Sequence, residues 1–285
     1  EADDDSPQEA ATKKILKAAI KSGSFLTLEL FLLTKDGRVD DFIVELVTTN
    51  TTSSSSSFNP LFFAAVQQSP ELTFKVIKFF FEVVFAAVNK SALQRKMILT
   101  TNQINSTILH VASNRRNLKL VRFLLSVIHA IDDDKSTLLR QALLQSNDHG
   151  NFPLLSAAIG DDTYFQTFDD EDDLLPEFRN SEVLSVLYAE TDKITDLTAV
   201  SNDDIDKFAK SSSFRRFTKT YDSTPQLPFL SEIFVYVALL QNEASGSYGC
   251  HEQFCFLWTK MEEKKVLTKE LFLTEFSRFN TVGTL

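Results

Sequence analysis

The sequence has few of the residues that interrupt or cross-link a chain. Its 285 residues include only 7 glycines, 7 prolines and 2 cysteines. So few turn-forming residues argue against an all-β fold with many tight turns and favour helices. The two cysteines, Cys250 and Cys255, are too few for a disulfide framework, and this predicts a reducing, intracellular compartment.

Positive charge is also scarce. Lys and Arg number 29 against 39 Asp and Glu, which gives a net charge of −10. Such a chain gains little from contacts with phosphate groups, so we expect it to bind neither nucleic acid nor an anionic membrane surface. The first residue is Glu rather than Met, from which we expect that the chain was trimmed and that any N-terminal targeting signal was removed with the missing part.

Long apolar runs are nearly absent. The longest, "TFKVIKFFFEVVFAAV" at residues 73–88, is interrupted by Lys75, Lys78 and Glu82. It is also shorter than the roughly 20 apolar residues that a bilayer requires. We therefore expect a buried helix of a soluble protein here and no membrane span.

What the chain does contain is an internal repeat. At a shift of 45 residues, residues 91–113 match residues 136–158 without a gap. A further copy lies at residues 46–65, interrupted by a "TTSSSSS" insertion, and a partial copy lies at residues 13–33. The aligned pairs are Leu93 with Leu138, Arg95 with Arg140, Ile98 with Leu143, Leu99 with Leu144, Asn102 with Asn147, Leu109 with Leu154, and Ala112 with Ala157.

Each unit has the pattern of a helix, a short break and a second helix. In the clearest unit, Thr107 is a suitable helix N-cap and apolar residues follow it on one helical face. The polar break "NRRN" comes next, and then "LKLVRFLL", whose apolar residues again share one face. One such hairpin cannot bury its own apolar face, so the copies are expected to stack.

The motifs of these units resemble ankyrin repeats. "TILHVAS" (residues 107–113) is similar to the Thr-Pro-Leu-His-x-Ala-Ala signature that opens an ankyrin repeat, and "NPLFFAA" and "FPLLSAA" match it in part. The resemblance implies an all-α fold, an ankyrin-type helical-repeat solenoid covering residues 10–190. Its repeats would span about 10–50, 51–100, 101–145 and 146–190, followed by a helical C-terminal cap or small domain at 191–285.

The repeats depart from the family in length and in two glycines. The spacing is about 45 to 48 residues rather than 33, which predicts extra helices between repeats at residues 91–99 and 136–144. Arg116 stands where the family has Gly between the helices, and Asn105 stands where it has the hairpin Gly. Long, Phe-rich repeats of this kind are similar in style to those of effector proteins from intracellular bacteria such as Legionella. That likeness implies secretion by a bacterium into the host cytoplasm.

The resemblance to ankyrin repeats also implies a function in protein–protein recognition. Ankyrin folds present their hairpin tips and inner helices as a rigid platform, whereas the signature histidine, here His110, is expected to be structural. The acidic balance favours a partner protein with a basic patch, and the oligomeric state stays open. Carried over to this chain, the partner-binding residues are Gln67, Gln68, Gln103, Asn114, Arg115, Asp148, His149, Asp161 and Asp162.

Two other functions remain open. In the first, the chain is an enzyme, for example a cysteine-dependent one, with the repeats as a targeting module and the chemistry in the C-terminal region. Cys250 would be its nucleophile. The side chains of residues adjacent in sequence rarely point at each other, so the base would have to be a distant histidine rather than His251. In the second, the chain is a structural adaptor that self-associates through C-terminal helices, expected at residues 228–242 and 266–279.

Neither metal nor cofactor chemistry has a complete motif in the sequence. The acidic run at residues 169–173 lacks the alternating ligands and the Gly of a calcium loop. Cys250, Cys255 and His251 are fewer than the four ligands of a structural zinc site. There is no glycine-rich phosphate loop, HExxH motif or nucleophile elbow. We therefore expect no catalytic residue, no bound metal and no cofactor.

Overall fold

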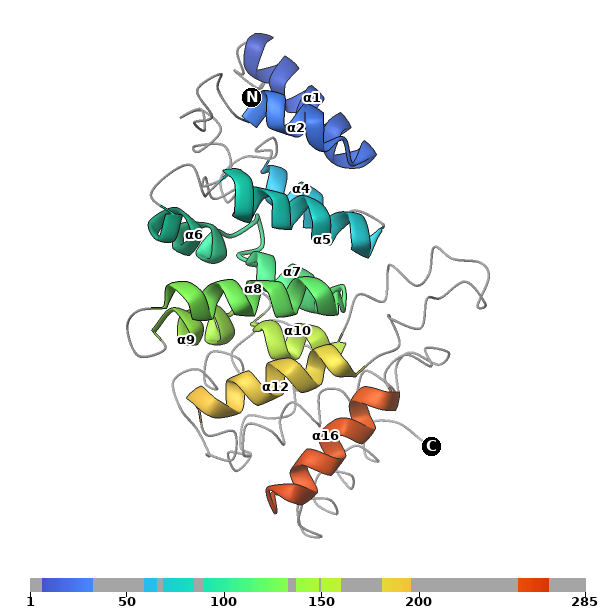
Figure 1. The fold of residues 1–285 in the computed structure, drawn as a ribbon. Helices are drawn as coiled ribbons and strands as arrows, with labels where there is room; N and C mark the ends of the chain where they lie inside the picture. Colours follow the sequence, from blue (N-terminus) through green and yellow to red (C-terminus); the bar gives the residue numbers. More distant parts are fainter. Residues whose placement is uncertain are drawn as a thin grey trace.

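A computed structural model describes residues 7–32, 59–65, 69–84, 90–132, 137–148, 150–159, 181–195 and 251–266. These residues are mostly helical and include no β-strand, so the all-α prediction is confirmed for this part of the chain. One isolated antiparallel bridge joins Thr101 to Thr107. The helices lie in successive layers along one long direction of the molecule (Figure 1).

The first layer is a hairpin of α1 (Pro7–Ser22) and α2 (Phe25–Leu32). Gly23 joins the two helices with a positive φ of 64°, which favours glycine. A Cβ added there would lie only 2.8 Å from Leu72 Cδ1 of the next layer. Gly23 therefore serves both the turn and the close approach of the two layers.

The second layer consists of α4 (Pro60–Ala65) and α5 (Pro70–Phe79), which continues as a π-helical turn at Phe80–Val84. Ser69 caps α5 by accepting a hydrogen bond from the Leu72 N–H. The Thr73 hydroxyl donates to the Ala64 carbonyl at 3.1 Å and ties α5 to α4. This layer contains most of the apolar run considered above. Within the described segments, no helix is both long and apolar enough to cross a membrane.

The next two layers repeat this arrangement of a short helix paired with a longer one. The first pair is α7 (Ile108–Asn114) with α8 (Leu118–Ile131). The second is α10 (Pro153–Ile159) with α12 (Glu182–Ile194). The short helices α4, α7 and α10 contact one another in series. Ala64, Ala112 and Ala157, one on each short helix, are all buried.

Two further helices, which the sequence predicts at residues 91–99 and 136–144, are present and lie at one side of the stack (Figure 1). They are α6 (Lys90–Leu99) and α9 (Thr137–Leu144), and both pack against α8 and against each other (Figure 1). The Asp132 carboxylate that follows α8 accepts hydrogen bonds from the Leu138 and Leu139 N–H groups. The end of one helix therefore caps the start of the next.

Phenylalanine accounts for much of the packing between layers. Phe80 and Phe81 in the π-helical turn are fully buried. Phe74 and Phe81 each meet Phe123 of α8 edge to face, with ring centroids 6.0 and 5.9 Å apart. Edge-to-face pairs of this kind add to the stabilisation from burial alone, so the second and third layers are joined by a small aromatic cluster.

The last described helix, α16 (His251–Glu263), is not where the sequence predicted C-terminal helices. The sequence predicted helices at residues 228–242 and 266–279 and none between them, whereas α16 lies between these two ranges. Leu257 and Met261 of α16 are buried, and Tyr188 of α12 meets Phe256 edge to face at 5.7 Å. Of the two helices expected on either side, residues 228–242 and 267–279 lie outside the described residues.

Candidate functional site

The most informative part of the surface is the hairpin tip that precedes α7. The Asn102 N–H donates to the Ser106 carbonyl at 3.0 Å, and the Asn102 side chain accepts from the Ser106 N–H at 2.9 Å. Asn105 turns the chain with a φ of 54°, a left-handed conformation that asparagine tolerates better than most residues. This agrees with the prediction that Asn105 replaces the hairpin glycine.

The tip that precedes α10 has the same hydrogen bonds at positions 45 residues later. The Asn147 N–H donates to the Asn151 carbonyl at 2.9 Å, and the Asn147 side chain accepts from the Asn151 N–H at 2.9 Å. Gly150 makes the left-handed turn, with a φ of 76°. The sequence repeat between these two segments is thus matched by equivalent local geometry.

Direct hydrogen bonds join the two tips side by side. The Asp148 N–H donates to the Ile104 carbonyl at 3.0 Å, and the Asn105 side-chain amide donates to the Asp148 carboxylate at 2.6 Å. The Asn147 amide donates to the Ser106 hydroxyl at 3.0 Å. We call residues 101–107, 145–148, 150 and 151 together the tip platform. Because both backbone and side-chain bonds connect its two segments, it is held as one unit.

His110 supports the tip platform from below. Its Nδ1 accepts from the Thr107 N–H at 3.1 Å, so Nδ1 is unprotonated and the ring proton lies on Nε2. Nε2–H then donates to the Asn151 carbonyl at 3.0 Å in the neighbouring tip. Burial lowers the pKa of His110 to about 4, which keeps it neutral. His110, which the sequence analysis expected to be structural, is thus buried and bonded within the fold.

Two of the predicted partner-binding residues lie on the tip platform. Gln103 and Asp148 are both exposed, one on each tip, and the bond from Asp148 to Ile104 brings their tips together. Of the other seven, Asn114 and Arg115 lie elsewhere in the fold, and five lie outside the described residues. Those outside the described residues are Gln67, Gln68, His149, Asp161 and Asp162.

Asn114 and Arg115 lie away from the tip platform, at the opposite end of α7. Their assignment as partner-binding residues stays a prediction. Both residues are partly buried, and the following Arg116 and Asn117 are buried. The reason is that the break packs on the preceding layer, where the Asn117 amide donates to the Pro70 carbonyl at 3.0 Å.

The sequence analysis did not select Ile104, which lies on the tip platform and whose carbonyl accepts from the Asp148 N–H. Its side chain is 42% exposed, although isoleucine is usually buried. Its neighbours on the surface are Gln103 and Asp148. Its position in the sequence could have identified it, because Ile104 follows Gln103 in the same predicted hairpin. The sequence analysis selected polar residues there and not apolar ones.

The structure describes only some of the residues that a cysteine-dependent enzyme would use. Cys250 lies outside it, and of His251 only the backbone is described. Cys255 is exposed on α16 and lines an open hollow of about 400 Å³ with Ser181, Phe256, Thr259 and Lys260. These lining residues include no imidazole or carboxylate. Among the described residues, no three His, Cys, Asp or Glu side chains are grouped so that they could hold a metal ion.

Comparison with known protein families, curated proteins and solved structures finds no match to this chain. The resemblance to ankyrin repeats therefore depends on the motifs of the sequence itself.

Proposed function

We propose that this chain is an ankyrin-type repeat solenoid that binds a partner protein through its hairpin tips and inner helices. The observation that carries the proposal is the hydrogen-bonded pair of tips, whose local geometry recurs at the 45-residue shift. A surface held in one conformation loses little conformational freedom when it binds, and this favours affinity.

The chemistry of the tip platform indicates the kind of partner. Ile104 offers an exposed apolar side chain, and Gln103 and Asp148 are exposed polar residues on the same platform. An apolar contact surrounded by polar groups is typical of protein interfaces. The exposed carboxylate and the net charge of −10 favour a partner with a basic patch. We further propose that the partner is a host protein and that the chain acts as a secreted bacterial effector.

The test begins with capture of the partner from host-cell lysate on the intact chain, followed by affinity measurements with the purified partner. Ile104→Ser should weaken binding by about tenfold, since central apolar contacts of an interface contribute on the order of 1–2 kcal/mol. The matched control is Leu30→Ser, which changes a leucine that is 71% exposed on α2. Equal affinities for Ile104→Ser and the unmodified chain would contradict the proposal.

A further inference from the structure

The two tips repeat one set of hydrogen bonds, and the bond that joins them connects identifiable positions of that repeat. At the 45-residue shift, Asn147 of the second tip corresponds to Asn102 of the first, and Asn151 corresponds to Ser106. Between the tips, the Asn147 amide donates to the Ser106 hydroxyl at 3.0 Å. The second tip therefore docks onto the first by pairing its asparagine amide with a side-chain acceptor at the position of Ser106.

The second tip has the same acceptor position, with no donor for it in the described part of the chain. Asn151 carries a side-chain oxygen where Ser106 carries its hydroxyl, and this Oδ1 is buried without a hydrogen-bond partner among the described residues. The backbone of Asn151 is fully used, because its N–H donates to the Asn147 side chain and its carbonyl accepts from the Asn147 N–H and from His110. A buried acceptor without a donor is unfavourable, so a molecule that supplies the donor gains affinity.

The equivalent geometry of the two tips indicates on which side the Asn151 side chain lies. The Ser106 hydroxyl lies on the side of the first tip that faces the second, since it meets Asn147 there. The second tip has the same local backbone, with left-handed turns at Asn105 and Gly150, which gives Asn151 the corresponding direction, away from the first tip. Asn151 is only partly buried, so its terminal amide can turn to meet a donor that arrives from this side.

We propose that the second tip binds a hairpin tip of the partner protein, in which an asparagine amide donates to the Asn151 side-chain oxygen. The partner tip repeats the pairing of Asn147 with Ser106 one step further along. The bond from His110 is not repeated, because Leu155 stands at the equivalent position and has no donor. A partner tip is therefore held by fewer bonds than the second tip, and Ile104 and the exposed polar residues of the tip platform supply the rest of the contact.

The acceptor favours a neutral amide over a charged side chain as the donor. The Asn151 oxygen carries no charge, and an ammonium or guanidinium group brought to this buried atom would lose its hydration without gaining a counter-charge. Basic groups of the partner are expected beside the exposed Asp148 instead. This inference rests on the proposed function, because it names the chemistry with which the tip platform holds its partner.

The probe is a cyclic peptide with the sequence of residues 145–151, because this segment already docks onto the first tip. Its binding to the intact, isotope-labelled chain is followed through backbone amide NMR signals, and those of Asn147, Gly150 and Asn151 should shift. A twin peptide that carries Asn147→Ala lacks the amide. The twin should bind about fivefold more weakly, which corresponds to the net contribution of one hydrogen bond.

Variants of the chain separate the Asn151 oxygen from other effects. On Asn151→Ala the two peptides should bind equally, because the variant lacks the acceptor that distinguishes them. This variant should not lower the melting temperature, since no bond to Oδ1 is lost in the free chain. Asn151→Ser provides a hydroxyl like that of Ser106 and should bind the unmodified peptide within about twofold of the wild type.

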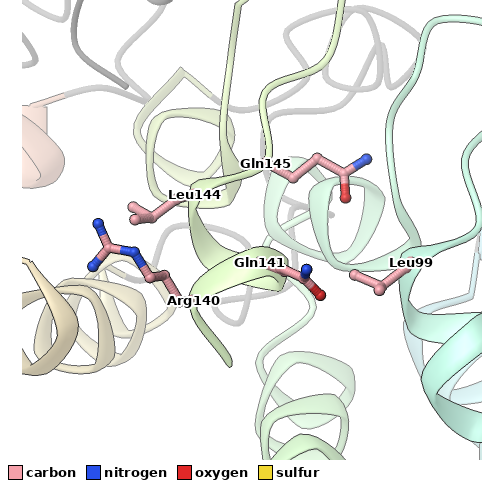
Figure 2. Close-up of a pocket in the computed structure, with 5 residues that line it drawn as sticks. All are labelled: Leu99, Arg140, Gln141, Leu144 and Gln145. Carbon is pink, nitrogen blue, oxygen red and sulfur yellow. The ribbon is translucent and has the colours of Figure 1, made fainter. Parts of the chain in front are cut away.

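The matched control is Gln141→Ala, which removes a different exposed amide near the same tip. Figure 2 shows Gln141 on α9, where its side chain lines an open hollow of about 420 Å³ together with Leu99 and Gln145. Because this side chain is not part of the tip platform, its loss should change affinity for the peptide by less than about twofold.

Several results would overturn the proposal. They are no binding of either peptide, equal binding of both to the wild type, or a difference between them that persists on Asn151→Ala. Dimers of the chain in sedimentation that Asn151→Ala separates would assign the site to a second copy of this chain rather than to a partner. If the peptides bind equally while Ile104→Ser still weakens binding of the captured partner, this inference fails and the proposed function stands. If the peptides differ as expected while Ile104→Ser has no effect on the partner, the proposed function fails.

Discussion

His110 illustrates how one buried side chain can connect two surface segments. Its Nδ1 accepts from Thr107 within its own tip, and its Nε2–H donates to Asn151 in the next tip. The bond that Nδ1 accepts requires the neutral ring, because protonated Nδ1 would face the Thr107 N–H with a hydrogen of its own. The stability of the tip platform therefore depends on pH.

We expect the free energy of unfolding to fall as the pH drops from about 6.5 to about 4. The unfolded chain takes up the His110 proton below its ordinary pKa of 6.5, whereas the folded chain does so only below about 4. The stability that the neutral His110 ring contributes is fully present above about pH 6.5. As the pH falls toward 4, this stability is lost at up to about 1.4 kcal/mol per pH unit. Urea unfolding of the wild type across this range measures the slope.

His110→Gln is the control, since it lacks the titrating ring while other groups in the chain titrate as before. The difference in unfolding free energy between wild type and His110→Gln should shrink as the pH falls from 6.5 to 4. A difference that stays constant over this range would show that His110 has the same pKa in the folded chain as in the unfolded chain.

At the residue scale the sequence predicted the local geometry better than the long-range contacts. The Thr107 cap and the left-handed Asn105 could both be inferred, because each depends on neighbours within a few residues. The bond from Asn105 to Asp148 could not, since it joins residues 43 positions apart. It exists only because the two tips pack side by side.

At the scale of elements, the Asn117 side chain makes two hydrogen bonds at the start of α8. Its side-chain oxygen caps the helix by accepting from the Leu120 N–H at 3.1 Å, and its amide donates to the Pro70 carbonyl of the preceding layer at 3.0 Å. Asn117→Ala removes both and should cost roughly 2 kcal/mol of stability, combining a lost cap with a lost bond between layers. Chemical denaturation measures this loss.

Asn117→Ser separates the effect of the helix cap from that of the hydrogen bond to Pro70. Serine is a comparably good N-cap but is too short to reach Pro70, so this variant should lose only the bond between layers, about 1 kcal/mol. If serine is as destabilising as alanine, the capping bond contributes nothing. If serine is as stable as the wild type, the bond to Pro70 contributes nothing.

Most helices could be located from the sequence, but α16 and the π-helical turn could not. The buried positions of α16, Gln253, Leu257 and Met261, recur every four residues, yet the intervening Phe and Trp residues obscure this period. The π-helical turn at Phe80–Val84 has no local signal of its own. It lies in a run whose apolar residues fit an ordinary α-helix equally well, and packing between layers decides its form.

At the scale of the whole molecule, the stack depends on close contact between the short helices. Ala112 of α7 is 1% exposed, and α7 contacts both α4 and α10. Ala112→Leu should destabilise the chain by about 1–3 kcal/mol or more, because added methylene groups have no space in a packed core. Thermal unfolding measures the change.

The control is Ala130→Leu on α8, which adds the same atoms at an exposed position. It should change stability by less than about 0.5 kcal/mol. Equal melting temperatures for the two variants would show that α7 does not lie between two other layers. The 45-residue shift in the sequence allowed Ala112 and Ala157 to be aligned, but the contacts of α7 with both α4 and α10 could be seen only once the layers were placed in space.

Hydrogen–deuterium exchange of the intact chain, with and without its purified partner, tests the central claim most directly. If the tip platform is the recognition surface, amide exchange should slow in residues 101–107 and 145–151 when the partner binds, while α1 and α2 should exchange at unchanged rates. Slower exchange confined to α1 and α2, with both tips unchanged, would contradict the account.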